Sequence, residues 1–352
     1  MKAMHIGDLT VPVPIVQGGM GVGISLSGLA AAVANNGGVG VISSAGLGLI
    51  YKDASKNFLQ ASIDGLRAEL RKARKHTKGA IGVNIMVALS NFDDMVRTSI
   101  EEKADVIFSG AGLPLDLPKF LTSDSVTKLV PIVSSAKGLR VICRKWKSKF
   151  NYLPDAVVVE GPNAGGHLGF KPEQLDDANY SLEELVEAVV RERDLCTEKY
   201  GVRFPVIAGG GLFTREDVRD ILSHGADGVQ IGSRFVTTTE CDAHEDFKQQ
   251  YIQAEEKDVM VIQSPVGMPG RALKNRFVEE VEAGARKPTG CPVKCIKTCD
   301  ISNTPYCIIS ALYNAYRGKL DRGYAFCGSK AYMADRISSV AEVMDDLKHA
   351  FE

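Results

Sequence analysis

Residues 156–169 read AVVVEGPNAGGHLG, and the fold and the function of the whole chain are inferred outward from this stretch. The apolar run 156–159 predicts a fully buried strand, because turn residues bound it and no polar residue interrupts it. The strand ends in Glu160, and four glycines follow within nine residues, which lets the backbone approach another surface closely. His167 stands among these glycines. The pattern indicates either a catalytic histidine on an α/β scaffold or a tight loop that a histidine caps.

Strand-like and helix-like segments alternate along the rest of the chain. Short apolar runs predict eight strands, at 14–17, 39–42, 80–85, 105–108, 130–133, 156–159, 205–208 and 228–231. Amphipathic or capped segments predict helices at 27–35, 55–75 and 92–103, from 136, after a capping pattern at 181–184, and at 214–223. Eight strands with interleaved helices fit a closed parallel barrel better than an open sheet. We therefore expect a TIM (β/α)8 barrel over residues 1–240 and a C-terminal, cysteine-containing helical extension over residues 241–352 that covers its active-site face.

Small and polar residues follow the C-terminal ends of most of the predicted strands. In closed parallel barrels that face holds the active site, and the loops after the seventh and eighth strands commonly bind a phosphate. Here those loops are Gly209-Gly210-Gly211 and Gly232-Ser233, whose backbone N–H groups and hydroxyl suit a phosphate. The glycines also suit plain tight turns, but their presence at both expected strands favours a phosphate site.

The composition is that of an ordinary globular protein, with 45% hydrophobic and 24% charged residues. A formal net charge of −1 over 352 residues gives no reason to expect nucleic acid or an anionic membrane as a partner. No apolar run approaches the length of a membrane span, and the first residues do not resemble a signal peptide. We expect a cytoplasmic protein.

Several motifs in order along the chain resemble a known family. They are Pro14 to Met20, Gly82 to Met86, Glu160 with Ala164-Gly165-Gly166-His167, Ile207 to Gly211, and Gln230 to Phe235. Together they are similar to the nitronate monooxygenase family, formerly called 2-nitropropane dioxygenases, and to the flavin-dependent enoyl-acyl-carrier-protein reductase II enzymes. The resemblance covers about residues 10 to 275. It implies a TIM barrel that carries non-covalent FMN.

The resemblance also implies roles for individual residues. His167 corresponds to the family's active-site histidine, which acts as a base or hydrogen-bond donor towards the substrate. An imidazole suits either role, because its pKa lies near working pH. The implied cofactor-binding residues are Gly18, Gly19, Met20, Asn84, Ser109 and Gly110 beside the flavin ring, Glu160, Gly165 and Gly166 on the central stretch, Gln230 at the ribityl chain or ring, and Gly210, Gly211, Gly232 and Ser233 at the phosphate.

Two later segments also resemble parts of the family. Residues 266–275 resemble a segment that folds back near the flavin, and 327–331 resemble a glycine-rich helix start that caps the active site. The second match is loose, because Lys330 stands where glutamine is usual. That departure puts the substrate pocket in doubt.

This chain has a group of cysteines that the common family pattern lacks. Cys291, Cys295 and Cys299 recur every four residues and Cys307 follows, so on a helix the first three would share one face. Four thiolates bind either zinc or a [4Fe–4S] cluster. Their spacing is not the compact C-x2-C pattern of zinc ribbons and ferredoxins, and buried free cysteines also act as small apolar residues. A metal centre and unliganded thiols are both compatible with the sequence.

Three functions are compatible with these observations. The first is FMN-dependent oxidation of alkyl nitronates with dioxygen. The second is NAD(P)H-dependent reduction of an enoyl thioester, bound to acyl carrier protein or CoA, or of another activated alkene or quinone. The third is a flavin-binding module without turnover, which a histidine on the glycine stretch disfavours. The sequence favours a small-molecule substrate and is compatible with a homodimer, but it does not identify the substrate or the preferred nicotinamide.

Overall fold

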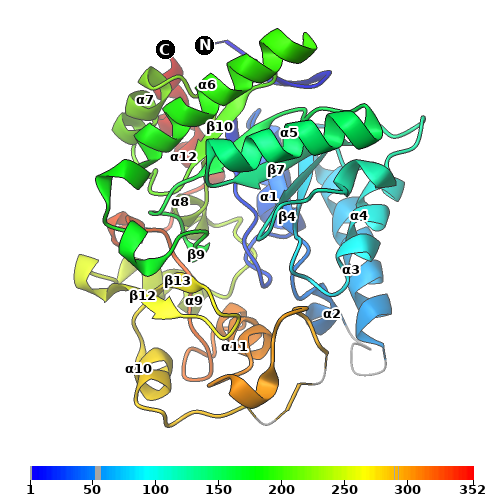
Figure 1. The fold of residues 1–352 in the computed structure, drawn as a ribbon. Coiled ribbons are helices and arrows are strands. Elements are labelled where there is room, and N and C mark those ends of the chain that lie inside the picture. Colours follow the sequence, from blue (N-terminus) through cyan, green and yellow to red (C-terminus); the bar gives the residue numbers. More distant parts are fainter. Residues whose placement is uncertain (1, 52–56, 289, 292) are drawn as a thin grey trace.

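A closed barrel of eight parallel strands forms the centre of the protein (Figure 1). The computed structural model describes residues 2–51, 57–288, 290–291 and 293–352. Around the barrel the strands run in chain order: β3 (Ile15–Gln17), β4 (Gly40–Ser43), β5 (Ile81–Met86), β6 (Val106–Gly110), β7 (Lys128–Val133), β8 (Val157–Glu160), β10 (Val206–Gly209) and β11 (Gly228–Ile231). Two hydrogen bonds of 2.9 Å close the ring, from Gln17 N to the Val39 carbonyl and from Val39 N to the Ile15 carbonyl. The predicted barrel is confirmed.

Helices cover the outside of the barrel. They are α1 (Ser27–Asn35), α2 (Leu47–Ile50), α3 (Phe58–His76), α4 (Phe92–Glu101), α5 (Ala136–Phe150), α6 (Leu182–Tyr200), α7 (Arg215–Ser223) and α8 (Ser233–Val236). The connection after β6 carries only the 3-10 turn η1 (Leu117–Phe120). The helix predicted from Ser55 begins at Phe58, and its first predicted residues lie outside the described part of the chain.

Side-chain caps explain why two of these helices begin where the sequence predicts. Thr214 accepts a hydrogen bond from the Asp217 N–H, and the Asp217 carboxylate accepts one from Thr214 N in return. Ser181 accepts from the Glu184 N–H at the start of α6. Such bonds satisfy backbone donors that have no partner inside the helix.

Residues on each strand alternate between the barrel interior and the layer under the helices. Val158 packs inside with Ile207 and Phe108, whereas Val157 and Val159 pack outward against the helices. Both faces are apolar because a parallel strand in this fold is buried on both sides. The continuous valine run is therefore a direct signature of the strand's position.

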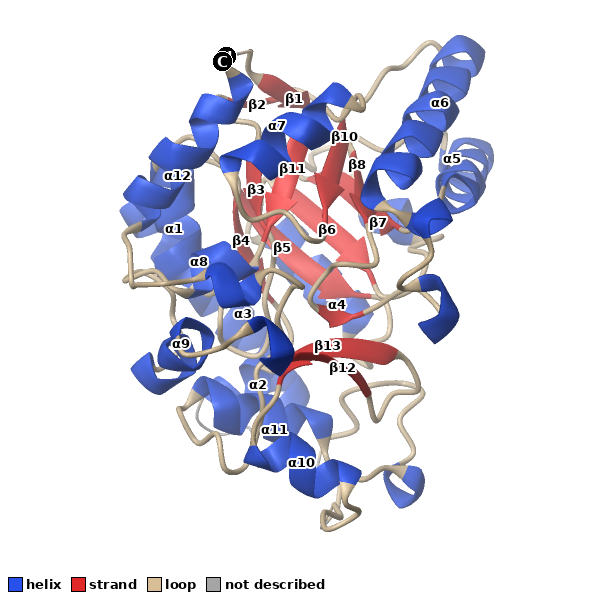
Figure 2. Cartoon of the chain, turned by 90° about the vertical axis from the view of Figure 1, so that its left-hand side faces the viewer, coloured by secondary structure: helices blue, strands red, loops and turns tan. Residues whose placement is uncertain are grey.

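An N-terminal hairpin closes one end of the barrel. Its strands β1 (Met4–Ile6) and β2 (Leu9–Val11) are antiparallel, and the sequence analysis did not predict them. Met4, Ile6 and Val11 belong to the same apolar cluster as the barrel interior. Figure 2 shows the hairpin at one end of the barrel and β12–β13 beyond the other.

Most of the C-terminal extension lies at the end of the barrel opposite the hairpin, but its last helix, α12 (Val340–Lys348), packs on the outside of the barrel against α1 and α7. It contains helices and one strand pair: α9 (Glu245–Ile252), β12 (Val259–Gln263), β13 (Pro269–Leu273), α10 (Arg276–Glu282), α11 (Ile308–Tyr316) and α12 (Val340–Lys348). β13 also pairs with β9 (Gly166–His167), so the extension forms a three-stranded sheet with the central stretch. The described part of 291–300 contains no helix, so the cysteines do not share a helix face as the spacing suggested. The division at residue 240 stays a prediction.

A search of the helices in the described residues finds none with the length and apolar character needed to cross a membrane.

We expect Ile6→Ala to lower the free energy of unfolding by about 2–5 kcal/mol, because it opens a cavity inside the barrel at a residue with no solvent exposure. Chemical denaturation followed by circular dichroism measures the change. Thr10→Ala, on the exposed face of the same hairpin, is the matched control and should change stability by less than about 0.5 kcal/mol. Equal stability of the Ile6 variant and the wild type would mean that the hairpin does not seal the barrel.

Candidate active site

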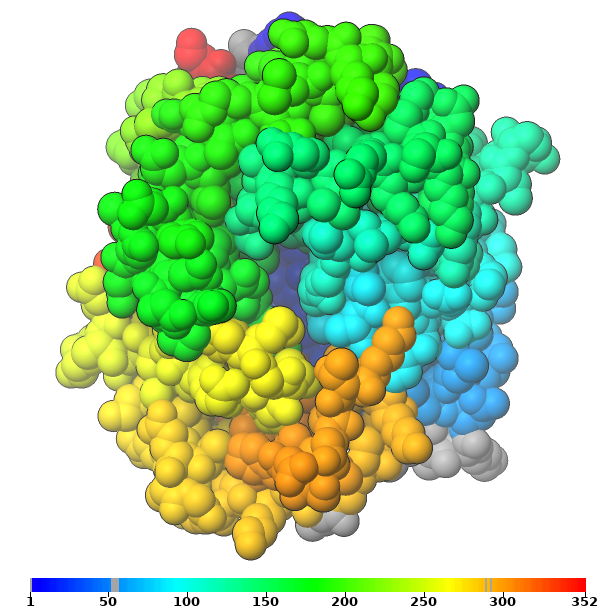
Figure 3. Space-filling model, in the orientation of Figure 1, coloured from blue at the N-terminus to red at the C-terminus, as the bar shows by residue number. Residues whose placement is uncertain are grey.

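A cavity of about 500 Å³ opens at the C-terminal ends of the barrel strands. The ends of all eight barrel strands and the loops after them form its floor and sides, and the extension forms its roof. Figure 3 shows the hollow, with the N-terminal part of the chain at its floor and the extension along its lower rim. The cavity therefore occupies the face on which the sequence predicted an active site.

Fourteen of the residues singled out from the sequence line this one cavity: Gly18, Gly19, Met20, Asn84, Gly110, Glu160, Gly165, Gly166, His167, Gly210, Gly211, Gln230, Gly232 and Ser233. Ser109 is not among the lining residues. It is fully buried, and its hydroxyl donates a hydrogen bond of 3.0 Å to the Ile85 carbonyl. The Ser109 hydroxyl thus joins two barrel strands, and a role for this residue beside a cofactor stays a prediction.

Residues 161–169, called here the glycine stretch, pack between the barrel and the extension. A Cβ on Gly165 would lie 2.6 Å from the carbonyl carbon of Cys327, so no side chain fits there. From the other side, Arg271 Nη1 donates hydrogen bonds to the carbonyls of Pro162 (2.6 Å) and Ala164 (2.8 Å). The guanidinium is buried and fixes the path of the stretch that carries His167.

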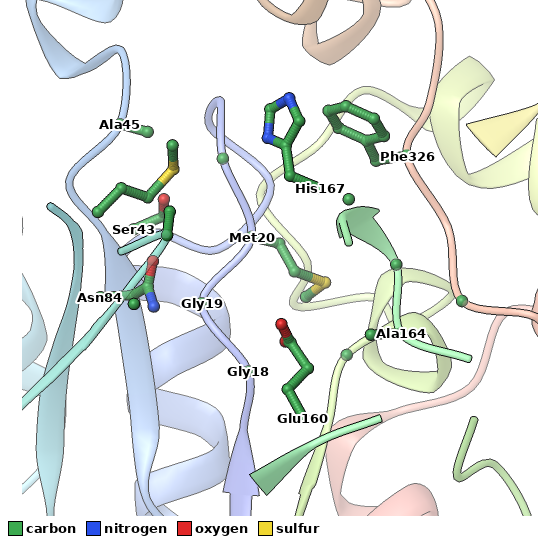
Figure 4. A pocket seen from close by; sticks show the side chains of 18 of the residues that line it. Gly18, Gly19, Met20, Ser43, Ala45, Asn84, Glu160, Ala164, His167 and Phe326 are labelled. Carbon is green, nitrogen blue, oxygen red and sulfur yellow. The ribbon is translucent and has the colours of Figure 1, made fainter. Parts of the chain in front are cut away.

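His167 is held in place by two residues of the extension. Its Nε2 shares a hydrogen bond of 2.7 Å with Ser264 Oγ, and its ring meets the ring of Phe326 edge-on at 5.1 Å between centroids. Figure 4 shows the two rings side by side in the pocket. Burial lowers the pKa of His167 from 6.5 to about 4, so the imidazole is neutral at pH 7. Within the described residues Nδ1 makes no hydrogen bond, which leaves this atom for a ligand.

Glu160 enters the pocket from the end of β8, and its carboxyl group points towards Met20 (Figure 4). Burial raises the pKa of Glu160 from 4.5 to about 7. No other group in the described chain forms a hydrogen bond with this carboxyl. The carboxyl lines the cavity and is partly exposed to it, so its position favours a bound polar ligand at this depth.

The far end of the cavity is built from three backbone segments that converge. Gly210 and Gly211 have positive φ angles of +102° and +84°, a conformation that L-residues rarely adopt. Ser233 Oγ accepts a hydrogen bond of 2.8 Å from Gly328 N, which brings 327–330 against the loop after β11. Lys330 lines the cavity here and forms an ion pair of 2.6 Å with Asp217. Backbone N–H groups and a nearby ammonium suit an anion.

The sequence did not single out Ser264, Arg271 or Phe326, although each contacts the glycine stretch or His167. They lie about 100 residues or more beyond that stretch, and neither periodicity nor spacing indicates such a contact. The only signal was the resemblance of 266–275 and 327–331 to segments that fold back near a flavin.

Of the four cysteines predicted as ligands, Cys295 lines the cavity and the other three do not. In the described part of the chain no three His, Cys, Asp or Glu side chains come close enough to hold a single metal ion. Burial, followed by the neighbouring charges of Cys307, Cys291 and Cys299, raises the pKa of Cys295 to about 12. All eight cysteines are free thiols.

Comparison with known structures gives the same barrel and extension. The structure of FabK from Thermotoga maritima superposes with a TM-score of 0.73 at 28% identity, covering 97% of this chain and 93% of that one. Nitroalkane oxidase from Streptomyces ansochromogenes superposes with a TM-score of 0.72 at 21% identity, covering 97% of both chains, a likeness of fold.

Curated relatives are similar over most of the chain. A 5-hydroxy-7a-methyl-1-oxo-octahydro-1H-indene-4-carboxyl-CoA dehydrogenase of Mycobacterium tuberculosis is 30% identical over 273 residues, 78% of this chain and 66% of the relative. The match therefore spans slightly less than two thirds of that relative's length. A probable nitronate monooxygenase of Staphylococcus aureus is 25% identical over 301 residues, covering 78% of each chain.

A family model described as nitronate monooxygenase matches residues 2–102 and 89–349, nearly the whole chain. Its span includes every residue that lines the cavity. The chain belongs to the nitronate monooxygenase family.

Proposed function

We propose that the protein is an FMN-dependent oxidoreductase whose cofactor occupies the cavity at the C-terminal ends of the barrel strands. One observation carries this proposal. A single cavity has at one end the backbone segments around Gly210, Gly211, Gly232 and Ser233, called here the anion cradle, and at the other a neutral histidine in a fixed position, His167. Glu160, Met20 and the glycine stretch line the same cavity, and Figure 4 shows Met20 and Glu160 on one side of His167. This arrangement suits a long ligand with a phosphate at one end and a reactive ring at the other.

The lining fits FMN in detail. Gly210, Gly211, Gly232 and Ser233 would hold the phosphate, and the Glu160 carboxyl is available for a polar group between phosphate and ring. Gly18, Gly19 and Met20 would lie against the ring, where a Cβ on Gly19 would come within 2.3 Å of the Asn84 Cβ. When bound, FMN supplies the electron-transfer chemistry, and the protein supplies orientation and electrostatics.

We propose alkyl nitronates as the first substrate class, with dioxygen as the second substrate. A nitronate is already an anion, so the reaction does not require a strong base. With a pKa of about 4, His167 is neutral and offers an N–H to a nitronate oxygen if Nδ1 carries the proton. Phe326, Ile309 and Leu312 provide an apolar wall for the alkyl group.

A second candidate is NAD(P)H-dependent reduction of an enoyl thioester of acyl carrier protein or CoA. The observation that favours it is the extent of the apolar wall that the extension forms together with β5 and the loop after it, which exceeds what a small nitronate would cover. Its residues are Met86, Leu89, Ile296, Ile308, Ile309 and Leu312. The similarity to FabK and to a carboxyl-CoA dehydrogenase supports the same candidate. In this reaction the His167 N–H would face the thioester carbonyl.

An anaerobic absorbance titration separates the two candidates. Bleaching of the flavin band by NADPH or NADH, followed by reoxidation with an enoyl thioester, would support the reductase. Bleaching by an alkyl nitronate and not by either nucleotide would support nitronate oxidation. A purified protein that neither contains nor takes up FMN would refute the proposal as a whole.

We expect His167→Ala to retain bound FMN and to lower kcat at least about 100-fold, because the hydrogen bond to the substrate is lost. His167 stays neutral from pH 8 down to about pH 5, so in the wild type its contribution to kcat should be constant over this range and change only as the pH approaches the pKa of about 4. Flavin absorbance of the desalted protein and steady-state kinetics measure both effects. Full activity in the variant would remove His167 from the reaction.

We expect Ser264→Ala to lower kcat about tenfold at unchanged FMN content, because the His167 ring loses the hydroxyl that orients it. Ser264→Thr keeps a hydroxyl and should restore most of kcat. If both variants lose the same activity, packing around residue 264 matters and the hydrogen bond does not.

We expect Gly232→Asp to weaken FMN binding at least about 30-fold through repulsion between the carboxylate and the phosphate. The position is suitable because its φ of −110° suits any residue and an added Cβ meets only Met20, at 3.4 Å from its sulfur. Fluorescence titration gives Kd for FMN and for riboflavin, which lacks the phosphate. Gly232→Ala is the control for size. Equal weakening of FMN and riboflavin would argue against a phosphate at this loop.

A further inference from the structure

Four free cysteines lie on the long connection between α10 and α11. Cys291, Cys295, Cys299 and Cys307, called here the thiol quartet, are separated by three, three and seven residues. Between Glu282 and Ile308 the described residues form only one short 3-10 turn, Ile301–Asn303. Connections of this length without secondary structure are uncommon in compact proteins, and those that are ordered need something to fix them.

The quartet segment is bound to the rim of the cavity. Ser90 N donates a hydrogen bond of 3.0 Å to the Cys295 carbonyl, and Lys297 N donates one of 3.0 Å to the Ala88 carbonyl. Leu89 and Ile296 form an antiparallel bridge between these two bonds. The segment thus runs alongside the loop after β5, with Cys295 facing the cavity.

Three of the four cysteines pack in or against one apolar cluster. Cys295 is 8% exposed and belongs to an apolar cluster with Leu89 and Ile309, and Cys299 and Cys307 pack against the same cluster. Cys291 is half-buried and precedes Cys295 by four positions in the sequence. Cys307 is the N-cap of the nine-residue helix α11, where free backbone N–H groups favour an anionic sulfur.

We propose that the thiol quartet binds an iron–sulfur cluster at the wall of the cavity. Four cysteine thiolates are the usual ligands of a [4Fe–4S] cluster. A single zinc ion needs its sulfurs about 2.3 Å from one centre, and in the described residues no three candidate ligands meet at such a point. A cluster of four irons is larger, so its thiolates stand farther apart. Lys294 and Lys297 lie within the segment and offset part of the cluster's negative charge.

This inference goes beyond the proposed flavin chemistry, because it assigns a second cofactor to residues outside the FMN site. The two sites share one boundary. Cys295 lines the cavity, as do Ile296, Ile308 and Ile309 around it, so the cluster would lie beside the flavin site with no other domain between them.

The test is the iron and acid-labile sulfide content of the full chain, purified under nitrogen and reconstituted with ferrous iron and sulfide. We expect about four irons and four sulfides per chain, with an electron paramagnetic resonance signal after reduction by dithionite. Cys295→Ser and Cys299→Ser should each lower bound iron to less than about a quarter of this. Cys291→Ser, at a less buried position, serves the same purpose if the Cys295 variant does not fold.

Cys143→Ala is the matched control, because Cys143 is buried on α5 on the outside of the barrel. It should keep the full iron content. FMN content, measured in every variant, reports on folding independently of the cluster. Stoichiometric zinc in place of iron, iron content unchanged in the Cys295 and Cys299 variants, or four freely alkylated thiols after reconstitution would each overturn the proposal. Wild-type protein that binds iron but takes up no FMN would contradict the proposed function and still support the iron–sulfur cluster.

Discussion

The close contact between the glycine stretch and the chain at Cys327 is the constraint on which the rest of the site depends. With no Cβ at Gly165, two backbones separated by 162 positions in sequence can touch. The buried guanidinium of Arg271 then donates hydrogen bonds to the carbonyls that this contact leaves without a helix or sheet partner. Any larger residue would push the extension off the barrel. The contacts of His167 with Phe326, and of Ser233 with Gly328 in the anion cradle, would then be lost, because each joins the barrel to the extension.

Local patterns were sufficient to predict the barrel. A strand such as 157–159 is buried on both faces, so its whole length is apolar and stands out from its surroundings. Helix starts such as Thr214 carry a capping pattern that satisfies the first backbone donors whatever surrounds the helix. That Gly210 and Gly232 line the cavity could be predicted from position alone, since both directly follow neighbouring strands, and phosphate binding there stays a prediction. In each case the physical cause lies within a few residues of the pattern.

The remaining features depend on contacts between distant segments. The hairpin of Met4 to Val11 is short, and only its burial against the barrel interior makes it stable. β13 is fully buried between β12 and the two-residue strand Gly166–His167, and the sequence analysis did not predict it because both partners lie outside its own local pattern. Ser264 gives no local sign that it meets a histidine 97 residues earlier. For the cysteines, regular spacing suggested a helix, whereas the described segment follows the loop after β5 instead.

The hairpin at the base of the barrel also has a kinetic consequence. Because apolar side chains fill that end, a ligand reaches the cavity from the face under the extension, where the hollow is visible in Figure 3. An electron donor and an electron acceptor that both need the same flavin face would then have to use that entrance in turn. Such an enzyme follows ping-pong kinetics, with parallel lines in double-reciprocal plots and competition by each substrate for the form that the other one uses.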